Sequence, residues 1–172
     1  MPDRWLQYKQ LLGLPERLML KMQGYGWILR NKIVWEKPNA MPVFANDRRS
    51  PCWEYIYHFT KSAKGYYFDL PLAKELGVDR DVIRVNIQPF ENHPASFPEK
   101  LIEPLILTTS RPDDVVGDMF LGSGTVAAVG KRLGRRYWGA DLNPDYIKDA
   151  QRRIDATTVN LNGLRQTDGE TA

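Results

Sequence analysis

The fold class of this chain follows from one stretch of sequence, Asp113-Asp114-Val115-Val116-Gly117-Asp118-Met119-Phe120-Leu121-Gly122-Ser123-Gly124-Thr125-Val126-Ala127-Ala128. The apolar run at residues 115–120 predicts a buried strand, because acidic and glycine turn residues bound it. A glycine turn at residues 122–124 follows at once, and from Thr125 the apolar residues recur at the spacing of one helix face. That face consists of Val126, Val129, Gly130 and Leu133.

A second strand is predicted at residues 137–141, and it ends on the carboxylate of Asp141. A strand, a glycine turn, a helix and a second strand form the unit with which an open α/β sheet builds a nucleoside-binding crevice. The glycines let the backbone approach a ligand closely, and a carboxylate can accept hydrogen bonds from both ribose hydroxyls. The stretch therefore predicts an α/β fold with a nucleoside site.

The spacing of the glycines leaves the identity of the ligand open. Gly122-x-Gly124-x-x-Ala127 also satisfies the relaxed dinucleotide fingerprint, and Asp141 lies at a suitable distance beyond it. Asp118, at the end of the first strand, would repel a pyrophosphate but attract the sulfonium and ammonium groups of S-adenosylmethionine. Charge therefore favours S-adenosylmethionine over NAD, and a glycine turn without any ligand is the third alternative.

The composition is that of an ordinary globular domain. The 172 residues are 42% hydrophobic and 26% charged, enough for one domain with a proper core. The net charge of +3 is compatible with nucleic-acid binding but does not argue for it. A single cysteine, Cys52, excludes an internal disulfide and a cysteine-rich zinc site, and no metal site is predicted. Without a signal peptide or a long apolar run, we expect a cytoplasmic chain with no membrane partner.

Several elements are predicted in the first part of the chain. A helix is expected at residues 14–24, with Leu18, Met19 and Met22 as its apolar face. Alternation predicts strands at residues 27–35 and 53–60. The second of these strands carries an aromatic stripe that we expect to face the core, namely Trp53, Tyr55, Tyr57 and Phe59. A turn and a short aromatic strand are expected at residues 61–69.

Two further helices are predicted later in the chain. Residues 101–107 form an apolar helix that Pro104 is expected to kink or shorten. Ser96 and Glu99 before it have the spacing of a capping box. Asn143 and Pro144 are typical of a helix start. The buried face of that last helix is expected to be Ile147, Ala150 and Ile154.

A series of motifs occurs in a characteristic order. The segments are Gly26-Trp27-Ile28-Leu29-Arg30-Asn31, Trp35-Glu36-Lys37-Pro38-Asn39, Met41-Pro42, Asp47-Arg48, Glu54-Tyr55-Ile56, Phe59-Thr60-Lys61-Ser62, Tyr66-Tyr67-Phe68-Asp69, His93-Pro94-Ala95-Ser96-Phe97-Pro98, Asp118-Met119-Phe120-Leu121-Gly122-Ser123-Gly124-Thr125 and Gly139-Ala140-Asp141-Leu142-Asn143-Pro144-Asp145-Tyr146. Over about residues 11–155 this series resembles the amino-methylating DNA methyltransferases, in the subgroup whose cofactor loop follows the catalytic half.

The resemblance implies a Rossmann-like S-adenosylmethionine-dependent methyltransferase fold and a role for each matching residue. The cofactor pocket would be lined by Asp118, Phe120, Gly122, Ser123, Gly124 and Thr125. Asp141 would hold the ribose, next to Leu142. The methionine end would be closed by His93, Pro94, Ala95, Phe97 and Pro98. The residues expected to lie toward double-stranded DNA are Lys37, Met41, Asp47, Arg48 and Arg49.

One departure from the family pattern concerns catalysis. The family's catalytic motif is an Asp, Asn or Ser followed by Pro-Pro and an aromatic residue, and this sequence contains no Pro-Pro dipeptide. The segment Asn143-Pro144-Asp145-Tyr146 imitates the motif, but a helix cap explains each of its residues. No catalytic residue is therefore assigned. Since the family's motif lies upstream, the resemblance implies a fold in which central strands are missing.

These observations predict a fragment or split subunit of a methyltransferase that acts on adenine N6 or cytosine N4. An upstream-encoded chain would then carry the catalytic motif. Within the C-terminal part of a methyltransferase domain, residues 1–155, we expect residues 11–92 on the DNA-facing side and residues 93–155 on the cofactor side. Residues 156–172 would form a polar tail. The alternative is a catalytically inactive module that binds S-adenosylmethionine or DNA and regulates a partner.

Overall fold

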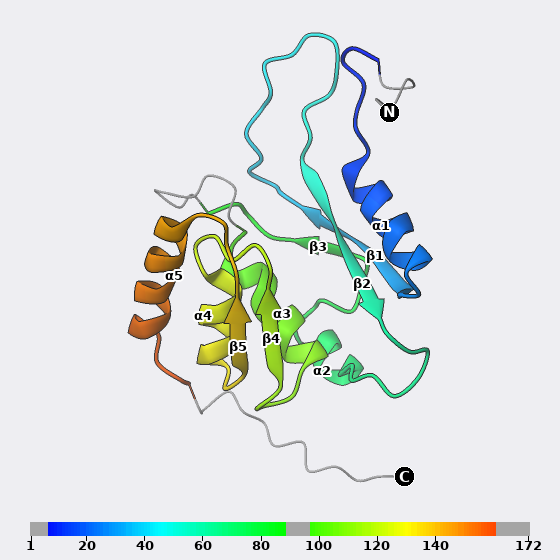
Figure 1. Ribbon diagram of the computed structural model, residues 1–172. Helices are drawn as coiled ribbons and strands as arrows, with labels where there is room; N and C mark the ends of the chain where they lie inside the picture. Colours follow the sequence, from blue (N-terminus) through cyan, green and yellow to red (C-terminus); the bar gives the residue numbers. More distant parts are fainter. Residues whose placement is uncertain (1–6, 89–96, 161–172) are drawn as a thin grey trace.

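The structure, a computed structural model, describes residues 7–88 and 97–160 (Figure 1). These residues form two small sheets and five helices. In chain order the elements are α1 (Leu14–Gly24), β1 (Ile28–Glu36), β2 (Trp53–Thr60), α2 (Leu70–Glu75), β3 (Val82–Arg84), α3 (Glu99–Thr109), β4 (Val115–Asp118), α4 (Thr125–Arg132), β5 (Arg136–Gly139) and α5 (Pro144–Ala156). The predicted α/β organisation is confirmed.

The first sheet has three strands, with β1 in the centre. β2 pairs with β1 in antiparallel orientation, whereas β3 pairs with the other edge of β1 in parallel orientation. Val34 of β1 lies opposite both Tyr55 and Val82. The register of the β1–β2 pair shifts between Leu29 and Asn31, where the strand carries a bulge.

The second sheet is the predicted strand–turn–helix–strand unit. β4 and β5 are parallel, and α4 connects them across one face of the pair. The predicted face of α4 is confirmed, because Val129 is buried and packs with Ile106, Leu133 and Val116. β4 ends at Asp118 rather than at residue 120, because the Asp118 carboxylate accepts a hydrogen bond from the Phe120 backbone N–H (2.9 Å) and turns the chain.

Helix α3 joins the two sheets. Leu101 on one side of α3 packs with Trp35 of β1 and Ile83 of β3. Ile106 packs with Val129 of α4. The described strands of the two sheets do not pair with one another. The core is therefore divided, and α3 is the element that both halves share.

The start and length of α3 differ from the sequence-based expectation. The helix continues to Thr109, so Pro104 does not shorten it, and the Thr108 hydroxyl donates to the Pro104 carbonyl (2.8 Å). The N-cap residue is Pro98, and no side chain caps the helix. The predicted capping box pairs Glu99 with Ser96, which lies outside the described residues. The Glu99 carboxylate is paired with two arginines.

Four further segments differ from expectation. Residues 61–69 form bends and irregular backbone without a strand. α2 and β3 were not predicted, because a six-residue helix and a three-residue strand leave little periodicity to detect. On β2, Trp53 is 46% exposed, and Tyr55 and Tyr57 are half-buried and stack on one another at 5.5 Å between ring centroids. The aromatic stripe is not part of the buried core, because it is Ile56 of β2, on the opposite face of the strand, that packs against the core around Trp35.

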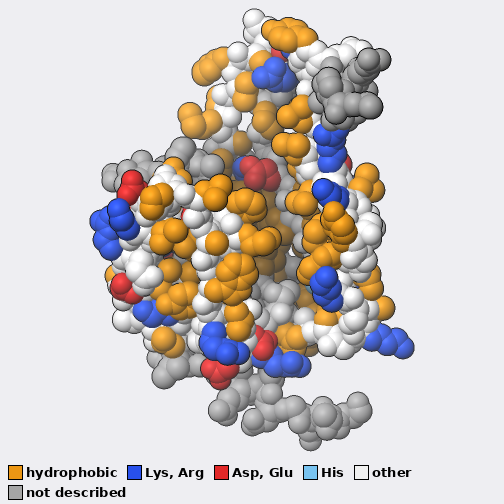
Figure 2. All heavy atoms as spheres, viewed as in Figure 1, with side chains coloured by type: hydrophobic (Ala, Val, Ile, Leu, Met, Phe, Trp, Pro, Cys, Tyr) orange, Lys and Arg blue, Asp and Glu red, His pale blue; other side chains and the backbone are white. Residues whose placement is uncertain are grey.

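Among the described residues, 7–88 and 97–160, no helix covers one face of the β4–β5 sheet. Val116 and Tyr137 lie under Gly130 of α4, so their strand neighbours Val115 and Trp138 point to the opposite face. Val115 is 52% exposed and Trp138 is 50% exposed. Figure 2 shows hydrophobic side chains gathered over β4 and β5 on this face. A parallel sheet is usually covered on both faces, so this apolar face is incomplete as it stands.

In the part of the chain that the structure describes, no helix combines the length and the apolar character needed to cross a membrane.

Candidate functional site

The glycine turn between β4 and α4 forms the centre of the candidate site. Gly122 and Gly124 both have positive φ, +49° and +75°, a backbone conformation that side chains other than glycine rarely adopt. A Cβ atom on Gly124 would lie 2.9 Å from the Cβ of Ala150 in α5. Any larger residue at this position would therefore both strain the turn and push it away from α5.

Asp141 joins this turn to the turn that follows β5. Its carboxylate accepts hydrogen bonds from the Gly122 and Asn143 backbone N–H groups, both at 2.9 Å. Carboxylate oxygens also accept hydrogen bonds from hydroxyl groups such as those of a ribose. The residue predicted to hold a ribose is thus fixed in orientation at the carboxyl end of the sheet, where open α/β folds bind their ligands.

The electrostatics of the turn fit a cationic ligand. Asp118 ends β4 and pairs with Gly139 of β5, two residues before Asp141, so both carboxylates belong to the same end of the sheet. Phe120 and Leu142, on the two turns, are 85% and 103% exposed. Two carboxylates disfavour a pyrophosphate and favour a sulfonium or ammonium group. Exposed apolar side chains suit a nucleobase.

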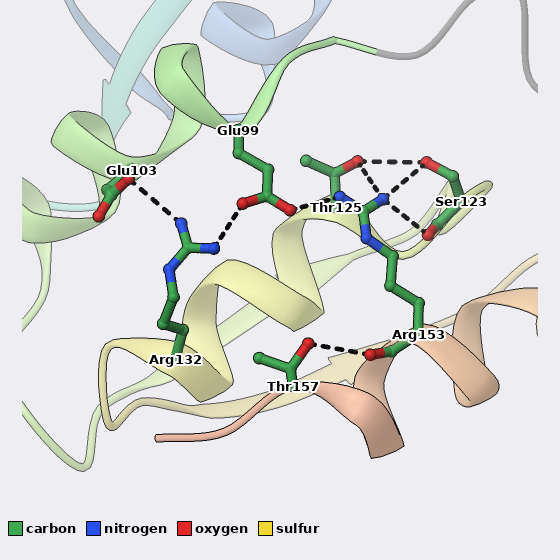
Figure 3. Close-up of polar contacts among 7 residues, drawn as sticks. All are labelled: Glu99, Glu103, Ser123, Thr125, Arg132, Arg153 and Thr157. Carbon is green, nitrogen blue, oxygen red and sulfur yellow. Dashed lines mark hydrogen bonds and ion pairs between the residues drawn. The ribbon is translucent and has the colours of Figure 1, made fainter. Parts of the chain in front are cut away.

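The hydroxyls of Ser123 and Thr125 are directed at α5. Both residues are buried, at 7% and 4% exposure, and their hydroxyl oxygens lie 3.2 Å apart. Arg153 of α5 donates to both hydroxyls, to the Ser123 carbonyl and to the carboxylate of Glu99 (Figure 3). Neither Glu99 nor Arg153 was predicted as a site residue. Their separation of 54 positions leaves no local pattern to detect.

Glu99 is held ionised by this arrangement. Burial raises the pKa of its carboxyl, but the hydrogen bonds and charges of Arg132 and Arg153 outweigh burial and hold the pKa below its usual value. The same hydrogen bond from Arg132 to Glu99 raises the pKa of the Arg132 guanidinium. Glu99, Arg132 and Arg153 therefore form a network of ion pairs that stays charged near neutral pH.

The residues expected at the methionine end are only partly described. His93, Pro94 and Ala95 lie outside the described residues. Phe97 packs against the core around Trp35 and Leu101, and Pro98 is buried at the start of α3. The chain thus enters α3 next to Glu99, which contacts the glycine turn through Arg153.

The residues expected to face DNA belong to the long loop between β1 and β2, which projects from the body of the molecule (Figure 1). Met41 at 83% exposure and the exposed Arg48 and Arg49 are accessible there. Asp47 pairs with Lys9 at 2.6 Å and with Arg48 at 3.6 Å. Lys37, at the base of the loop, is already engaged: it pairs with Glu54 and lies 4.4 Å over the ring of Trp35.

The segment that imitates a catalytic motif is a helix cap, as predicted. The Asn143 side chain accepts from the Asp145 backbone N–H (2.9 Å), and Pro144 is the first residue of α5. Ala150 and Ile154 are buried as expected, but Ile147 is 42% exposed, which corrects the predicted face of this helix. Among the described residues, no three His, Cys, Asp or Glu side chains are grouped to hold a metal ion.

Comparison with known proteins identifies the family. A family model described as DNA methylase matches residues 9–152. The chain belongs to the DNA methylase family. It is 42% identical over 163 residues to the type II methyltransferase M.Cfr9I of Citrobacter freundii, covering 91% of this chain and 54% of that protein. It is 38% identical over 158 residues to M.SmaI of Serratia marcescens, covering 87% of this chain and 54% of the relative.

Two solved structures share the fold. The PvuII cytosine-N4-specific DNA methyltransferase superposes with a TM-score of 0.75 at 22% identity, over 87% of this chain and 60% of that chain. The M1.HpyAVI complex with S-adenosylmethionine gives a TM-score of 0.70 at 22% identity, over 85% of this chain and 72% of that chain. The expected Rossmann-like methyltransferase fold is therefore confirmed in partial form. The chain spans about half the length of the relatives it matches, 54% of M.Cfr9I.

Proposed function

We propose that this chain is the cofactor-binding and DNA-facing part of an S-adenosylmethionine-dependent DNA methyltransferase that modifies adenine N6 or cytosine N4. The observation that carries the proposal is the Asp141 carboxylate, which holds the glycine turn after β4 and the turn after β5 at the carboxyl end of the sheet. Membership of the DNA methylase family supports it. When bound, S-adenosylmethionine supplies an electrophilic methyl group.

The residues of this chain would bind and orient rather than react. Asp141 receives the ribose, and Asp118 attracts the positive charge of the cofactor. Phe120 and Leu142 supply exposed apolar surface beside the adenine ring. The segment at residues 93–98 would cover the methionine end. In this division, residues 93–155 form the cofactor side, and residues 11–92 face double-stranded DNA.

We propose further that the catalytic motif comes from polypeptide outside residues 1–172, either upstream sequence of the same protein or a partner chain. The absence of any Pro-Pro dipeptide supports this assignment. The uncovered apolar face at Val115 and Trp138 supports it as well. β3 and β4, each with one described neighbour only, offer strand edges to which such a segment can pair.

The first test is transfer of a labelled methyl group from S-adenosylmethionine to unmethylated DNA. The purified chain is assayed alone and together with the upstream half of a relative such as M.Cfr9I. We expect label in the DNA only when the second polypeptide is present. Label with the chain alone would contradict the split arrangement, and Asn143 would then be the first residue to substitute. No label in either mixture would contradict the proposed catalysis.

A catalytically inactive module that binds S-adenosylmethionine or DNA and regulates a partner is the second candidate. The missing Pro-Pro motif is the observation that favours it. Titration calorimetry with S-adenosylmethionine and with NAD distinguishes both candidates from an oxidoreductase. Because of the carboxylates of Asp118 and Asp141, we expect the chain to bind S-adenosylmethionine and not NAD. Cofactor binding together with failure of every complementation experiment would favour this candidate.

A further inference from the structure

Arg153 holds the glycine turn from the side of α5. Its Nη1 donates to the Ser123 carbonyl at 3.1 Å, to the Ser123 hydroxyl at 3.3 Å and to the Thr125 hydroxyl at 3.1 Å. The side chain is only 19% exposed. Ala150, one turn earlier in α5, lies against Gly124. One face of α5 therefore contacts the turn at two places. Ala150 lies against Gly124, and Arg153 binds Ser123 and Thr125 on either side of it.

Glu99 connects this contact to α3. Its Oε1 lies 2.5 Å from Nη2 of Arg153, and its Oε2 lies 2.5 Å from Nη1 of Arg132. Arg132 also pairs with Glu103 at 3.2 Å, one turn further along α3. Figure 3 shows Glu99 between the two guanidinium groups, with Thr125 and Ser123 beside the guanidinium of Arg153. The turn, α3, α4 and α5 are thus joined by one carboxylate.

The turn needs such an external support. Two of its residues are glycines at positive φ, and glycine confers the greatest backbone freedom. Hydrogen bonds between charged groups are directional and strong, and a guanidinium can serve several acceptors at once in a fixed plane. A second hydrogen bond also joins α4 to α5: the Lys131 ammonium donates to the Ile154 carbonyl at 2.7 Å, near the end of α5.

We propose that Arg153 is a positioning residue for cofactor binding, and that Glu99 couples the glycine turn to the Phe97–Pro98 segment that leads into α3. This inference rests on the proposed function, in which the turn binds S-adenosylmethionine. Arg153 would touch no cofactor atom. It acts by fixing Ser123 and Thr125, so that the Gly122 N–H stays aligned with Asp141.

The test compares Arg153→Met and Glu99→Gln with a matched control, Arg152→Met. Arg152 is the neighbouring residue of α5, 78% exposed, and it pairs only with Asp149 on the outer face in the described contacts. Titration calorimetry at low temperature, where each variant is folded by circular dichroism, measures S-adenosylmethionine affinity. We expect Arg153→Met to weaken binding about tenfold, equal to the loss of one charge-assisted hydrogen bond. Arg153→Lys should recover part of this loss, and Arg152→Met should bind as the wild type does.

Hydrogen exchange supplies a readout that does not depend on the cofactor. In the apo protein, Arg153→Met should speed exchange of the amides at residues 122–125 while the amides of β1 and β2 keep their protection. Faster exchange without any cofactor binding by the wild type would contradict the proposed function and leave the support of the turn established. Unchanged exchange and unchanged affinity would overturn the inference. A uniform rise in exchange throughout the chain would also overturn it, because Arg153 would then stabilise the fold as a whole.

Discussion

The Asp141 carboxylate accepts hydrogen bonds from two backbone amides that belong to different turns, those of Gly122 and Asn143. Under the proposed function, the same side chain would both hold the two turns together and bind the ribose of the cofactor. Carboxylate oxygens accept hydrogen bonds from hydroxyl groups as well as from amides. Loss of the negative charge of Asp141 is therefore expected to lower the stability of the protein even when no ligand is bound.

Substitution of Asp141 by Asn tests this double role. The amide keeps one acceptor oxygen, so one backbone N–H loses its partner, and we expect the free energy of unfolding to fall by about 1–3 kcal/mol. Affinity for S-adenosylmethionine should fall at least about tenfold. Urea denaturation and titration calorimetry provide the two measurements. Asp145→Asn is the control, because Asp145 is 77% exposed and pairs only with Lys148 among its described side-chain contacts. Wild-type affinity in Asp141→Asn would rule out its role in the site.

Glu99 makes stability depend on pH. Its pKa is lower in the folded protein than in the unfolded chain, because the arginines outweigh the effect of burial. Its contribution is therefore complete above the unfolded value of about 4.3 and is lost as pH falls through the lower folded value. We expect the free energy of unfolding to decline below about pH 4.3, and to decline less steeply in Glu99→Gln. Urea denaturation across this range gives the comparison, and parallel curves for the two proteins would exclude the ion pair as a cause.

Helix α5 begins at a cap that can be tested separately from catalysis. Asn143 accepts from the Asp145 backbone N–H, and its own backbone N–H donates to Asp141. Asn143→Ala removes only the side-chain bond, so we expect a loss of about 1 kcal/mol in unfolding free energy. Cofactor affinity should stay unchanged by calorimetry. Asn143→Asp, which keeps the cap, is the matched control. Methyl transfer abolished by both substitutions would indicate a catalytic Asn143 instead.

The β1–β2 loop presents Arg48 and Arg49 to solvent, and we predict that it contacts DNA phosphates. Each phosphate contact releases counterions, and its loss lowers the slope of log affinity against log salt by about 0.9. Arg49→Ala in the complemented enzyme should therefore weaken DNA binding at low salt and flatten this slope. Arg152→Ala changes the same charge on the outer face of α5 and should leave the slope unchanged. Equal slopes for wild type and Arg49→Ala would remove Arg49 from the interface.

In the part of the fold that the structure describes, an apolar sheet face is uncovered, and assembly with a second polypeptide should bury it. Trp138 on that face is 50% exposed. Val115→Asp, on the same face and 52% exposed, should prevent complementation by the catalytic half, because a charge cannot be buried there without a partner. Ile147→Lys on α5, 42% exposed, is the control and should complement normally. Pull-down with the upstream half measures assembly, and binding by Val115→Asp would exclude this face as the contact.

Local patterns determined the elements that depend on neighbouring residues. The β4–α4–β5 unit and the cap at Asn143 were predictable because each relies on residues a few positions apart, at the period of a helix or in a turn. The order of the motifs also indicated the family, which the match over residues 9–152 confirmed. Boundaries were less predictable: β4 ended two residues early, since the Asp118 side chain turned the chain there.

Only the tertiary structure decided which partners the charged residues found. Glu99 has the sequence features of a helix cap, but it lies between Arg132 and Arg153 because α3, α4 and α5 pack together. Sequence spacing also failed to predict burial for the aromatic stripe on β2 and for Ile147 on α5. Alternation or helical spacing identifies which residues share a face, but not which other segment covers that face. The periodicity of a segment predicts its secondary structure. Burial and ion pairing depend instead on contacts between segments that are tens of residues apart in the sequence. For this reason the sequence alone determined the βαβ unit and the family, and the structure revealed the Arg153 support of the glycine turn.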